Sequence, residues 1–292
     1  MKVSLAVLLT LFLSPVLQAA KPATADTLFA HDHLMQVEVK MDPDDWHALR
    51  ISHRETGETF AQIVEKPYEY YPATAVIDGR EIGEVGIRKK GFFGSAISTR
   101  PSLKLKLDYV DKDKEFAGQD RLTFNNNNQD PTRAQTVLVY QFMNDAGVLS
   151  PRSNLARVIV NGEDLGIYTH VESVRKPFIK RLFGKSKGNL WEGYAGDFTE
   201  SEYGRIVHKW GEDDESASLQ KLYDLLQNTD PIVLESVEEL LDLDAFITLW
   251  ASEVLIGHWD GYASNRNNYY IFRPKKSGLF YFTPWGLSLI HI

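Results

Sequence analysis

Two pairs of alternating segments, each joined by a turn dipeptide, constrain the fold of this chain more than any other feature of its sequence. The pairs are residues 73–78 and 84–88 around Asp78-Gly79, and residues 155–160 and 165–171 around Asn161-Gly162. Tight hairpins favour Asp-Gly and Asn-Gly because both turn positions need a positive φ angle. The sequence therefore predicts two β-hairpins.

A third alternating segment, residues 102–108, sets lysines against leucines. Successive side chains of a strand point to opposite faces, so the leucines share one face and Lys104 and Lys106 share the other. Residues 34–40 alternate in the same way and predict another strand. Asp42-Pro43 after it has the residue types of a helix start.

The elements predicted further along the chain are mostly helices. They run from the Asp130-Pro131-Thr132 cap to about Ala146, over 217–227, over 231–241, and from Asp244 to about Ile256. The last is apolar on most of its surface, so we expect it to be buried. Residues 196–216 are acidic and predict a surface loop. Only a hairpin from Tyr269 to Phe282 follows. A strand-rich part before a helix-rich part predicts an α+β fold in two lobes.

The composition excludes several classes of function. The chain has 292 residues, a formal net charge of −8 and no cysteine. The negative charge gives no electrostatic footprint for nucleic acid. The lack of cysteine excludes disulfides, thiol nucleophiles and cysteine-based zinc sites. The eight histidines show no paired metal-binding spacing, and no G-x-S-x-G motif of a serine hydrolase occurs.

The N-terminus has the pattern of a secretion signal. Lys2 precedes an apolar run, and Ala19-Ala20 offers a cleavage site. A membrane anchor is the alternative, but the run is shorter than the ~20 residues that a bilayer span needs, and Pro15 interrupts it. We therefore expect residues 1–20 to be a signal peptide. The mature protein would be secreted to the periplasm or the cell surface and would carry no membrane segment.

The last six residues, 287–292, read LSLIHI, which a transposon end used in sequencing libraries also encodes. We expect this hexapeptide to derive from such an adapter, so that the native part of the domain covers residues 21–286. A short native apolar tail is the alternative.

A kinase-like motif follows the predicted helix that ends near Ile256. In His258-Trp259-Asp260, the aspartate is followed five positions later by Asn265. The protein-kinase catalytic loop has the pattern H-R-D-x-x-x-x-N, in which Asp accepts the substrate proton and Asn holds a magnesium ion. In this chain tryptophan replaces the arginine. Asp260 and Asn265 are also common turn residues after a helix, so the pattern alone leaves both interpretations open.

A glycine-bearing basic loop precedes the lysine strand. Arg88 and two lysines lead into Gly91-x-x-Gly94, and Lys104 and Lys106 follow. Kinases cover the ATP phosphates with a glycine-rich loop and contact them with a strand lysine. Arg88, Gly91, Lys104 and Lys106 are therefore candidate nucleotide-binding residues. A solvated strand face is the alternative origin of alternating lysines.

Two further polar stretches have open interpretations. Glu172, at the exit of the 165–171 strand, lies either where a kinase hinge would contact the nucleotide or on the surface. The asparagines at 125–128 favour a strand end and an Asx turn over a ligand role.

The chain resembles the CotH family of atypical kinases from about Leu28 to Gly286, with its stretches in consistent order. The stretches are 85–91, 102–107, 116–118 with Leu122 and Asn125, 130–133, 161–172, 188–190, 259–270 and 284–285. The resemblance implies an atypical kinase-like two-lobed fold. It also implies ATP-dependent phosphorylation of serine or threonine in secreted or coat proteins.

Carried over by position, the resemblance implies Asp260 as the catalytic aspartate and Asn265 as a ligand of Mg²⁺ or Mn²⁺. It implies Lys104 as the nucleotide contact, with Lys106 as its rival. The family usually continues Pro-Trp-Asp-x-Asp or Pro-Trp-Gly-x-Asp, and the final Asp binds metal. In this chain Ser288 stands at that position, so we expect an incomplete metal site and an inactive 292-residue chain.

The leading hypothesis is a secreted, monomeric, ATP-dependent kinase that acts on Ser or Thr of a protein substrate. A catalytically inactive binding, adhesion or coat module on the same fold is the alternative. A metal-dependent hydrolase is disfavoured because the required ligand spacings are missing from the sequence.

Overall fold

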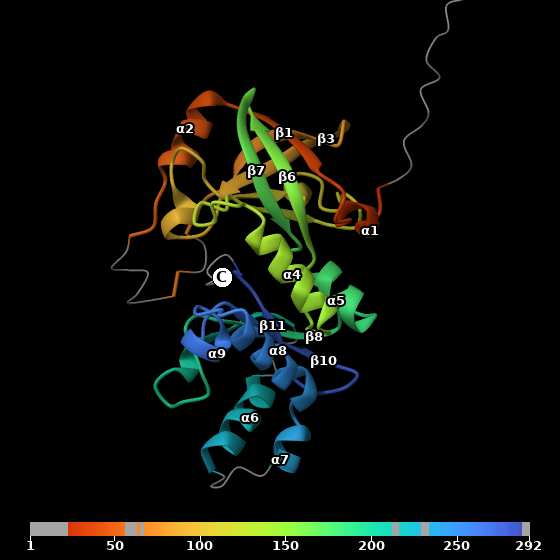
Figure 1. The fold of residues 1–292 in the computed structure, drawn as a ribbon, viewed down its shortest axis with the longest axis vertical. Coiled ribbons are helices and arrows are strands. Elements are labelled where there is room, and N and C mark those ends of the chain that lie inside the picture. The colour runs from red at the N-terminus through yellow and green to blue at the C-terminus, as the bar shows by residue number, and fades with distance from the viewer. Residues whose placement is uncertain (1–22, 56–62, 65–66, 212–215, 229–233, 288–292) are drawn as a thin grey trace, which may run out of the picture.

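A computed structural model describes residues 23–55, 63–64, 67–211, 216–228 and 234–287 (Figure 1). The fold is mixed α+β, as predicted: a strand-rich barrel is followed by a four-stranded sheet with helices. None of the helices described is long and apolar enough to cross a bilayer. The predicted signal peptide, residues 1–20, and Ser288 lie outside the described residues.

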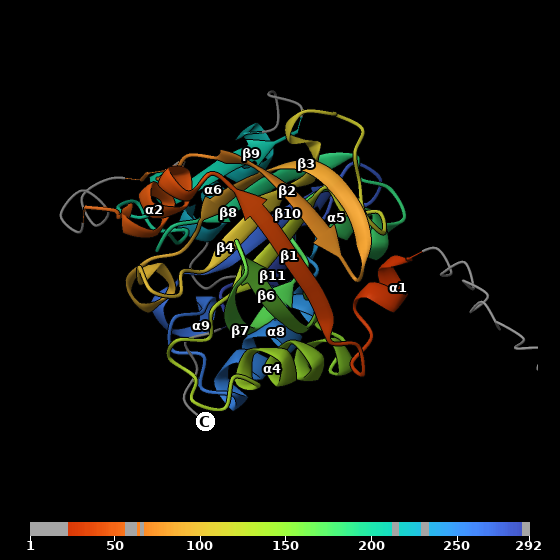
Figure 2. The ribbon, with the colours of Figure 1, turned by 90° about the horizontal axis from the view of Figure 1, so that it is seen from above.

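Seven strands close into a barrel in the order β1-β2-β3-β4-β5-β7-β6 (Figure 2). They are β1 (Met35–Met41), β2 (Tyr71–Ile77), β3 (Arg80–Lys89), β4 (Leu103–Lys106), β5 (Arg121–Asn125), β6 (Ser153–Val160) and β7 (Glu163–Val171). Neighbouring strands are antiparallel except β1 and β6, whose parallel pairing closes the barrel. Turn signals do not reveal this pairing, because it joins segments far apart in the sequence.

Both predicted hairpins are present, and their turns have the positive φ angles that the dipeptides suggest. The angles are 49° and 72° at Asp78 and Gly79, and 51° and 82° at Asn161 and Gly162. The alternation in β4 is also confirmed, because Leu103 is buried in the barrel core while Lys104 is half-buried on the opposite face. The strand is shorter than expected, since residues Leu107–Tyr109 form the 3₁₀ turn η2.

The second sheet has the strand order β11-β10-β8-β9 and lies below the barrel in Figure 1. Its strands are β8 (Gly188–Gly193), β9 (Ile206–Trp210), β10 (Tyr269–Pro274) and β11 (Tyr281–Pro284). The helices of this part are α5 (Lys176–Phe183), α6 (Ser216–Asn228), α7 (Leu234–Glu238), α8 (Leu243–Leu255) and α9 (Tyr262–Asn265). Leu222 of α6, Leu249 of α8 and Phe282 of β11 meet in one apolar core, separate from that of the barrel.

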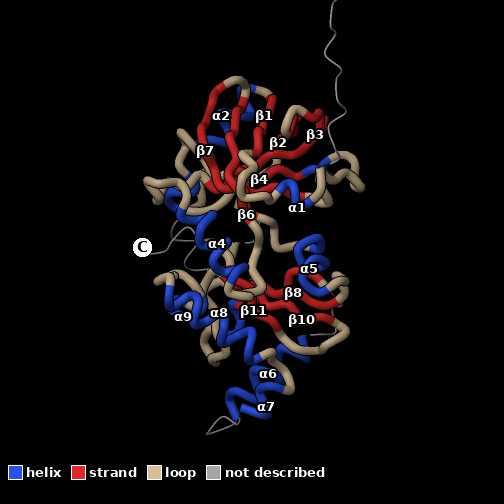
Figure 3. The backbone as a smooth tube through the Cα atoms, turned by 45° about the vertical axis from the view of Figure 1, so that its right-hand side comes forward, coloured by secondary structure: helices blue, strands red, loops and turns tan. Residues whose placement is uncertain are grey.

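Three further helices are α1 (Ala25–Leu28), α2 (Pro43–Ile51) and α4 (Gln135–Asp145), and α4 runs between the barrel and the second sheet (Figure 3). Asp42 caps α2 as predicted, because its side chain accepts a hydrogen bond from the Asp44 backbone at 2.8 Å. The helix predicted from Asp130 begins only at Gln135. The chain turns between them, where Arg133 has a φ of 58°.

Three predictions about the second part are corrected. Residues 196–216 are not one loop, since they include the 3₁₀ turn η3 (Tyr203–Arg205) and strand β9, which pairs with β8 at the sheet edge. Of the helix predicted over residues 231–241, the structure describes only the short helix α7. The helix predicted from Asp244 exists as α8, but only one face packs on the core. Apolar residues on its other face are exposed, including Val254 at 63% and Leu255 at 74%.

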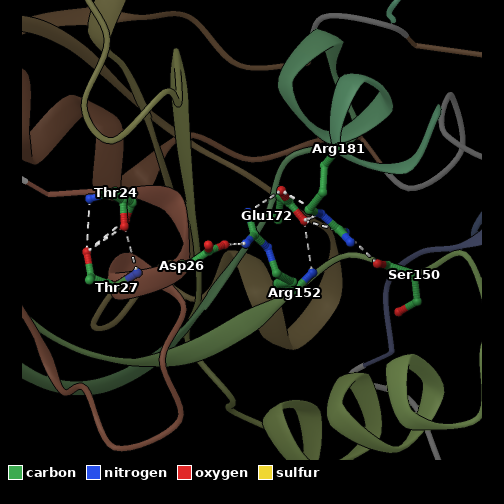
Figure 4. Close-up of polar contacts among 7 residues, drawn as sticks. All are labelled: Thr24, Asp26, Thr27, Ser150, Arg152, Glu172 and Arg181. Carbon is green, nitrogen blue, oxygen red and sulfur yellow. Dashed lines mark hydrogen bonds and ion pairs between the residues drawn. The ribbon is translucent and has the colours of Figure 1, made fainter. Parts of the chain in front are cut away.

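A buried carboxylate joins the barrel to α5 (Figure 4). Glu172, just after β7, is 1% exposed. Its Oε1 accepts a hydrogen bond from Arg152, which precedes β6, at 3.1 Å, and its Oε2 accepts one from Arg181 of α5 at 2.7 Å. Arg181 also donates to the Ser150 carbonyl at 2.9 Å. Two guanidinium groups therefore balance a charge whose burial would otherwise be costly.

We expect Glu172→Ala to lower the free energy of unfolding by about 3 kcal/mol, because it removes one partner of a buried charge cluster. The matched control is Glu163→Ala, which removes a carboxylate that is 49% exposed and pairs with Arg50 at 3.1 Å. The control should cost less than about 1 kcal/mol, as surface ion pairs do. Urea unfolding of both variants checks this, and equal losses would contradict it.

Candidate active site

Asp260 lies in the turn between α8 and α9, where it is 8% exposed. Three asparagine amides surround its carboxylate. Asn265 donates to Oδ1 at 2.7 Å, Asn267 donates to Oδ1 at 3.3 Å, and Asn268 donates to Oδ2 at 2.6 Å. Amides are neutral, so they occupy lone pairs of the carboxylate without balancing its charge. The structure thus brings Asp260 and Asn265 together, as the motif predicts.

Asn267 and Asn268 are site residues that the motif does not single out. Asn268 also donates to the Asp260 carbonyl at 2.9 Å, and its own carbonyl accepts a hydrogen bond from the Trp285 backbone at 2.7 Å. An ideal Cβ at Gly286 would lie 2.6 Å from the Asn268 Oδ1, so a side chain would not fit there. These contacts place the start of the segment after β11 beside the Asp260 turn. In the sequence, the only signal for Asn267 and Asn268 was the density of asparagines after the kinase-like motif.

Cations gather on the outer face of β3 and β4. Arg88 and Lys104 are directly opposite each other in the β3–β4 pairing, where like charges repel. The pKa of Lys104 is lowered to about 7, mainly by burial and in addition by the nearby charges of Arg88, Lys90 and Arg175, while Glu192 of β8 acts in the opposite direction. Burial and Arg88 likewise lower the pKa of Lys90 to about 7. A bound anion would relieve this repulsion, so the cluster suits phosphate.

Trp285 connects the cationic cluster to the Asp260 turn. Its ring centroid lies 6.0 Å from the Lys90 Nζ and 5.9 Å from the ring of Tyr270. Tyr270 donates a hydrogen bond to Glu192 at 2.9 Å. Since the Trp285 backbone also bonds Asn268, residues of the barrel and of the second sheet form one contiguous region.

Gly91 needs to be glycine for two reasons. It has a φ of 85°, and an ideal Cβ would lie 2.4 Å from the Ser95 Cβ. The chain continues into the 3₁₀ turn η1 (Phe93–Ala96). The Asn126 side chain donates to the carbonyls of Gly94, at 3.0 Å, and of Arg100, at 2.7 Å. The basic loop is therefore held in place by a buried asparagine, and the asparagine run has the structural role that we expected.

Two of the candidate nucleotide-binding residues, Lys106 and Glu172, have contacts with other side chains of the protein. Lys106 has its Nζ 5.8 Å from the ring centroids of both Tyr70 and Tyr109. Both carboxylate oxygens of Glu172 are occupied by arginines. This geometry favours Lys104 over Lys106 as the nucleotide contact and gives the Glu172 side chain a stabilising role. A nucleotide contact by either Lys106 or Glu172 stays a prediction.

The described part of the chain does not provide a complete metal site. It contains no group of three or more His, Asp or Glu side chains that could hold an ion. Asp260 and Asn265 offer the oxygen ligands that Mg²⁺ prefers, but they are too few. The position of the expected further carboxylate, Ser288, lies outside the described residues. Metal binding at this turn stays a prediction.

Comparison with known proteins gives a family and three relatives. A model described as CotH kinase protein matches residues 87–289. Inner spore coat protein H of Bacillus subtilis (strain 168) is 26% identical over 191 residues, which cover 59% of this chain and 50% of that protein. An inner spore coat protein H-like protein of the same strain is 26% identical over 203 residues, which cover 67% of this chain and 59% of that protein.

The third relative is invasin CotH3 of Rhizopus delemar, 23% identical over 172 residues that cover 53% of this chain and 29% of that protein. The chain thus spans about half the length of the spore-coat relatives. The family match includes β4 with its lysines, the Asp260 turn and Trp285, and it covers most of the chain. This protein therefore belongs to the CotH kinase family.

Proposed function

We propose that this protein transfers the γ-phosphate of ATP to serine or threonine hydroxyls of a protein substrate outside the cytoplasm. The barrel would be the strand-rich lobe of an atypical kinase fold, and the second sheet with its helices would be the other lobe. The observation that carries the proposal is the contiguity of two groups. The β3–β4 cations suit phosphate, and the Asp260 carboxylate lies in the same region, connected through Trp285.

Each group has a role in such a transfer. The acceptor oxygen attacks the γ-phosphorus, the bond from that phosphorus to the bridging oxygen of ADP breaks, and the hydroxyl proton passes to Asp260. The asparagine amides orient Asp260 but add no positive charge that would compete with the proton. Arg88, Lys90 and Lys104 bind phosphate oxygens. Mg²⁺ or Mn²⁺ would neutralise charge on the phosphates, with Asn265 among its ligands.

A place at the cell surface or in a coat is part of the proposal. The relatives are named inner spore coat proteins and an invasin, and the first twenty residues have the pattern of a secretion signal. A monomeric enzyme and a protein acceptor belong to the same proposal.

A non-catalytic coat or binding module is the second candidate. The names of the relatives describe coat and invasion roles rather than an enzyme. The described residues also lack a full set of metal ligands. This candidate predicts that the protein transfers no phosphate from ATP.

In the protein with its native C-terminal sequence, we expect Asp260→Ala to reduce phosphotransfer by about 10²- to 10⁴-fold, because the acceptor loses its proton-accepting group. The assay follows labelled γ-phosphate into dephosphorylated casein and into the protein itself. Asp244→Ala, which removes an exposed carboxylate of α8, is the control and should keep full activity. Equal activity of wild type and Asp260→Ala would reject the role of Asp260. An inactive wild type that also fails to bind ATP would favour the non-catalytic module.

ATP affinity should fall as the pH rises from 6 to 9. Lys104 and Lys90, with pKa values of about 7, lose their charge in the free protein over this range, and phosphate favours the protonated amines. Binding of MgATP at pH 8 should therefore take up protons, which calorimetry in buffers of different ionisation enthalpy measures.

The variant Lys104→Arg should take up fewer protons at pH 8, because a guanidinium stays charged throughout. The control Lys112→Arg changes an exposed lysine and should match the wild type. Equal proton uptake by wild type and Lys104→Arg would show that Lys104 does not contact the phosphates.

A further inference from the structure

Glu253 of α8 is a fully buried carboxylate beside the Asp260 turn, with its side chain 0% exposed. Its Oε2 accepts a hydrogen bond from the Ala263 backbone at 2.8 Å, and its Oε1 lies 3.3 Å from the His258 Nδ1. We assign the proton of this contact to the His258 Nδ1, which then donates to the Glu253 Oε1. His258 and Ala263 flank Asp260 in the sequence. One carboxylate therefore holds both ends of the turn.

Gly261 leaves the space that this carboxylate occupies. An ideal Cβ there would lie 2.3 Å from the His258 Nδ1 and 2.7 Å from the Glu253 Oε1. The φ angle of Gly261 is −87°, which any residue can adopt. The requirement for glycine therefore comes from contact with the Glu253–His258 pair and not from the backbone.

The chemistry of Glu253 differs from that of a purely stabilising carboxylate. Glu172, equally buried, is balanced by two arginines. Among the residues that the structure describes, the one titratable side chain paired with Glu253 is His258. Burying a carboxylate is costly, and an apolar residue would fill the same core position at lower cost. Unlike an apolar residue, Glu253 accepts hydrogen bonds from the two sides of the turn.

We infer that Glu253 is a positioning residue that fixes the turn around Asp260 by accepting the Ala263 N–H and the His258 Nδ1–H. The inference rests on the proposed function, in which Asp260 takes the acceptor proton. Glu253 touches neither ATP nor the acceptor. Its effect is therefore on the rate of transfer, since a shift of about 1 Å in a catalytic group can cost about 10²-fold.

The test compares E253Q with E253M in the protein with its native C-terminal sequence. Glutamine keeps an oxygen for the Ala263 N–H, and its amide can donate to a neutral His258. Methionine has a similar length but no comparable acceptor, so the Ala263 N–H loses its partner. In E253M, we expect kcat per ATP-binding site to fall about 10²-fold, with KM for ATP within about two-fold of wild type. In E253Q, we expect both kcat and KM for ATP to stay within about ten-fold of wild type.

Hydrogen exchange supplies a readout that does not need activity. Amides of residues 258–268 should exchange faster in E253M than in E253Q, while the barrel strands remain unchanged. A merely stabilising role would reduce the fraction of folded protein and leave kcat per binding-competent site and the local exchange pattern unchanged.

Gly261→Ala tests the same contact without altering Glu253. Its new methyl group would displace the Glu253–His258 pair, so kcat should fall as in E253M and exchange over 258–268 should rise. Gly204→Ala is the matched control, because an ideal Cβ at Gly204 has nothing within 4 Å. It should behave like wild type.

The outcomes separate this inference from the proposed function. Unchanged exchange over 258–268 in both E253M and Gly261→Ala overturns the positioning role, whatever the activity. Faster exchange with unchanged kcat overturns it as well. If the wild type transfers no phosphate, the proposed function fails and the catalytic part of the inference fails with it. The exchange data then still decide whether Glu253 orders the turn.

Discussion

The buried Glu172 carboxylate is the interaction on which the arrangement of the two parts depends. It follows the last barrel strand, and the arginines that balance it come from the segment before β6 and from α5. If either arginine moved away, the buried carboxylate would keep only one of the two charges that balance it. The cluster of Glu172 with its two arginines thus holds α5 against the barrel. Since the second sheet follows α5 in the chain, the cluster also helps to place β8 relative to β4.

Three of the four buried carboxylates of the described chain, Glu172, Glu253 and Asp260, differ in the kind of partner that they have. Glu172 has cations, Glu253 has a histidine and a backbone amide, and Asp260 has only neutral amides. Cations balance the charge of a buried carboxylate and so give stability. Neutral donors orient the group and leave its charge to act on whatever approaches. Among these three, Asp260 is the carboxylate whose surroundings fit the proposed proton transfer.

Local chemistry made the hairpins, the α2 cap and the lysine face of β4 predictable from the sequence. Asp78-Gly79 and Asn161-Gly162 specify their turns through their own φ preferences. Long-range pairing was not predictable in this way. The parallel β1–β6 closure, the β8–β9 edge and the Trp285–Asn268 bond join residues that no local pattern connects. For the same reason, Asp260 and Asn265 were visible as a motif, while Glu253 and Asn268 were not.

The apolar periodicity of α8 predicts a buried helix, but one of its faces is exposed. Val254 and Leu255 lie on that face in solvent, while Glu253 lies on the inward face and accepts a hydrogen bond from the Asp260 turn. The inward face therefore carries a carboxylate where packing alone would select an apolar side chain. In the proposed function, the hydrogen bond that Glu253 accepts from the Asp260 turn explains why a carboxylate stands at that position.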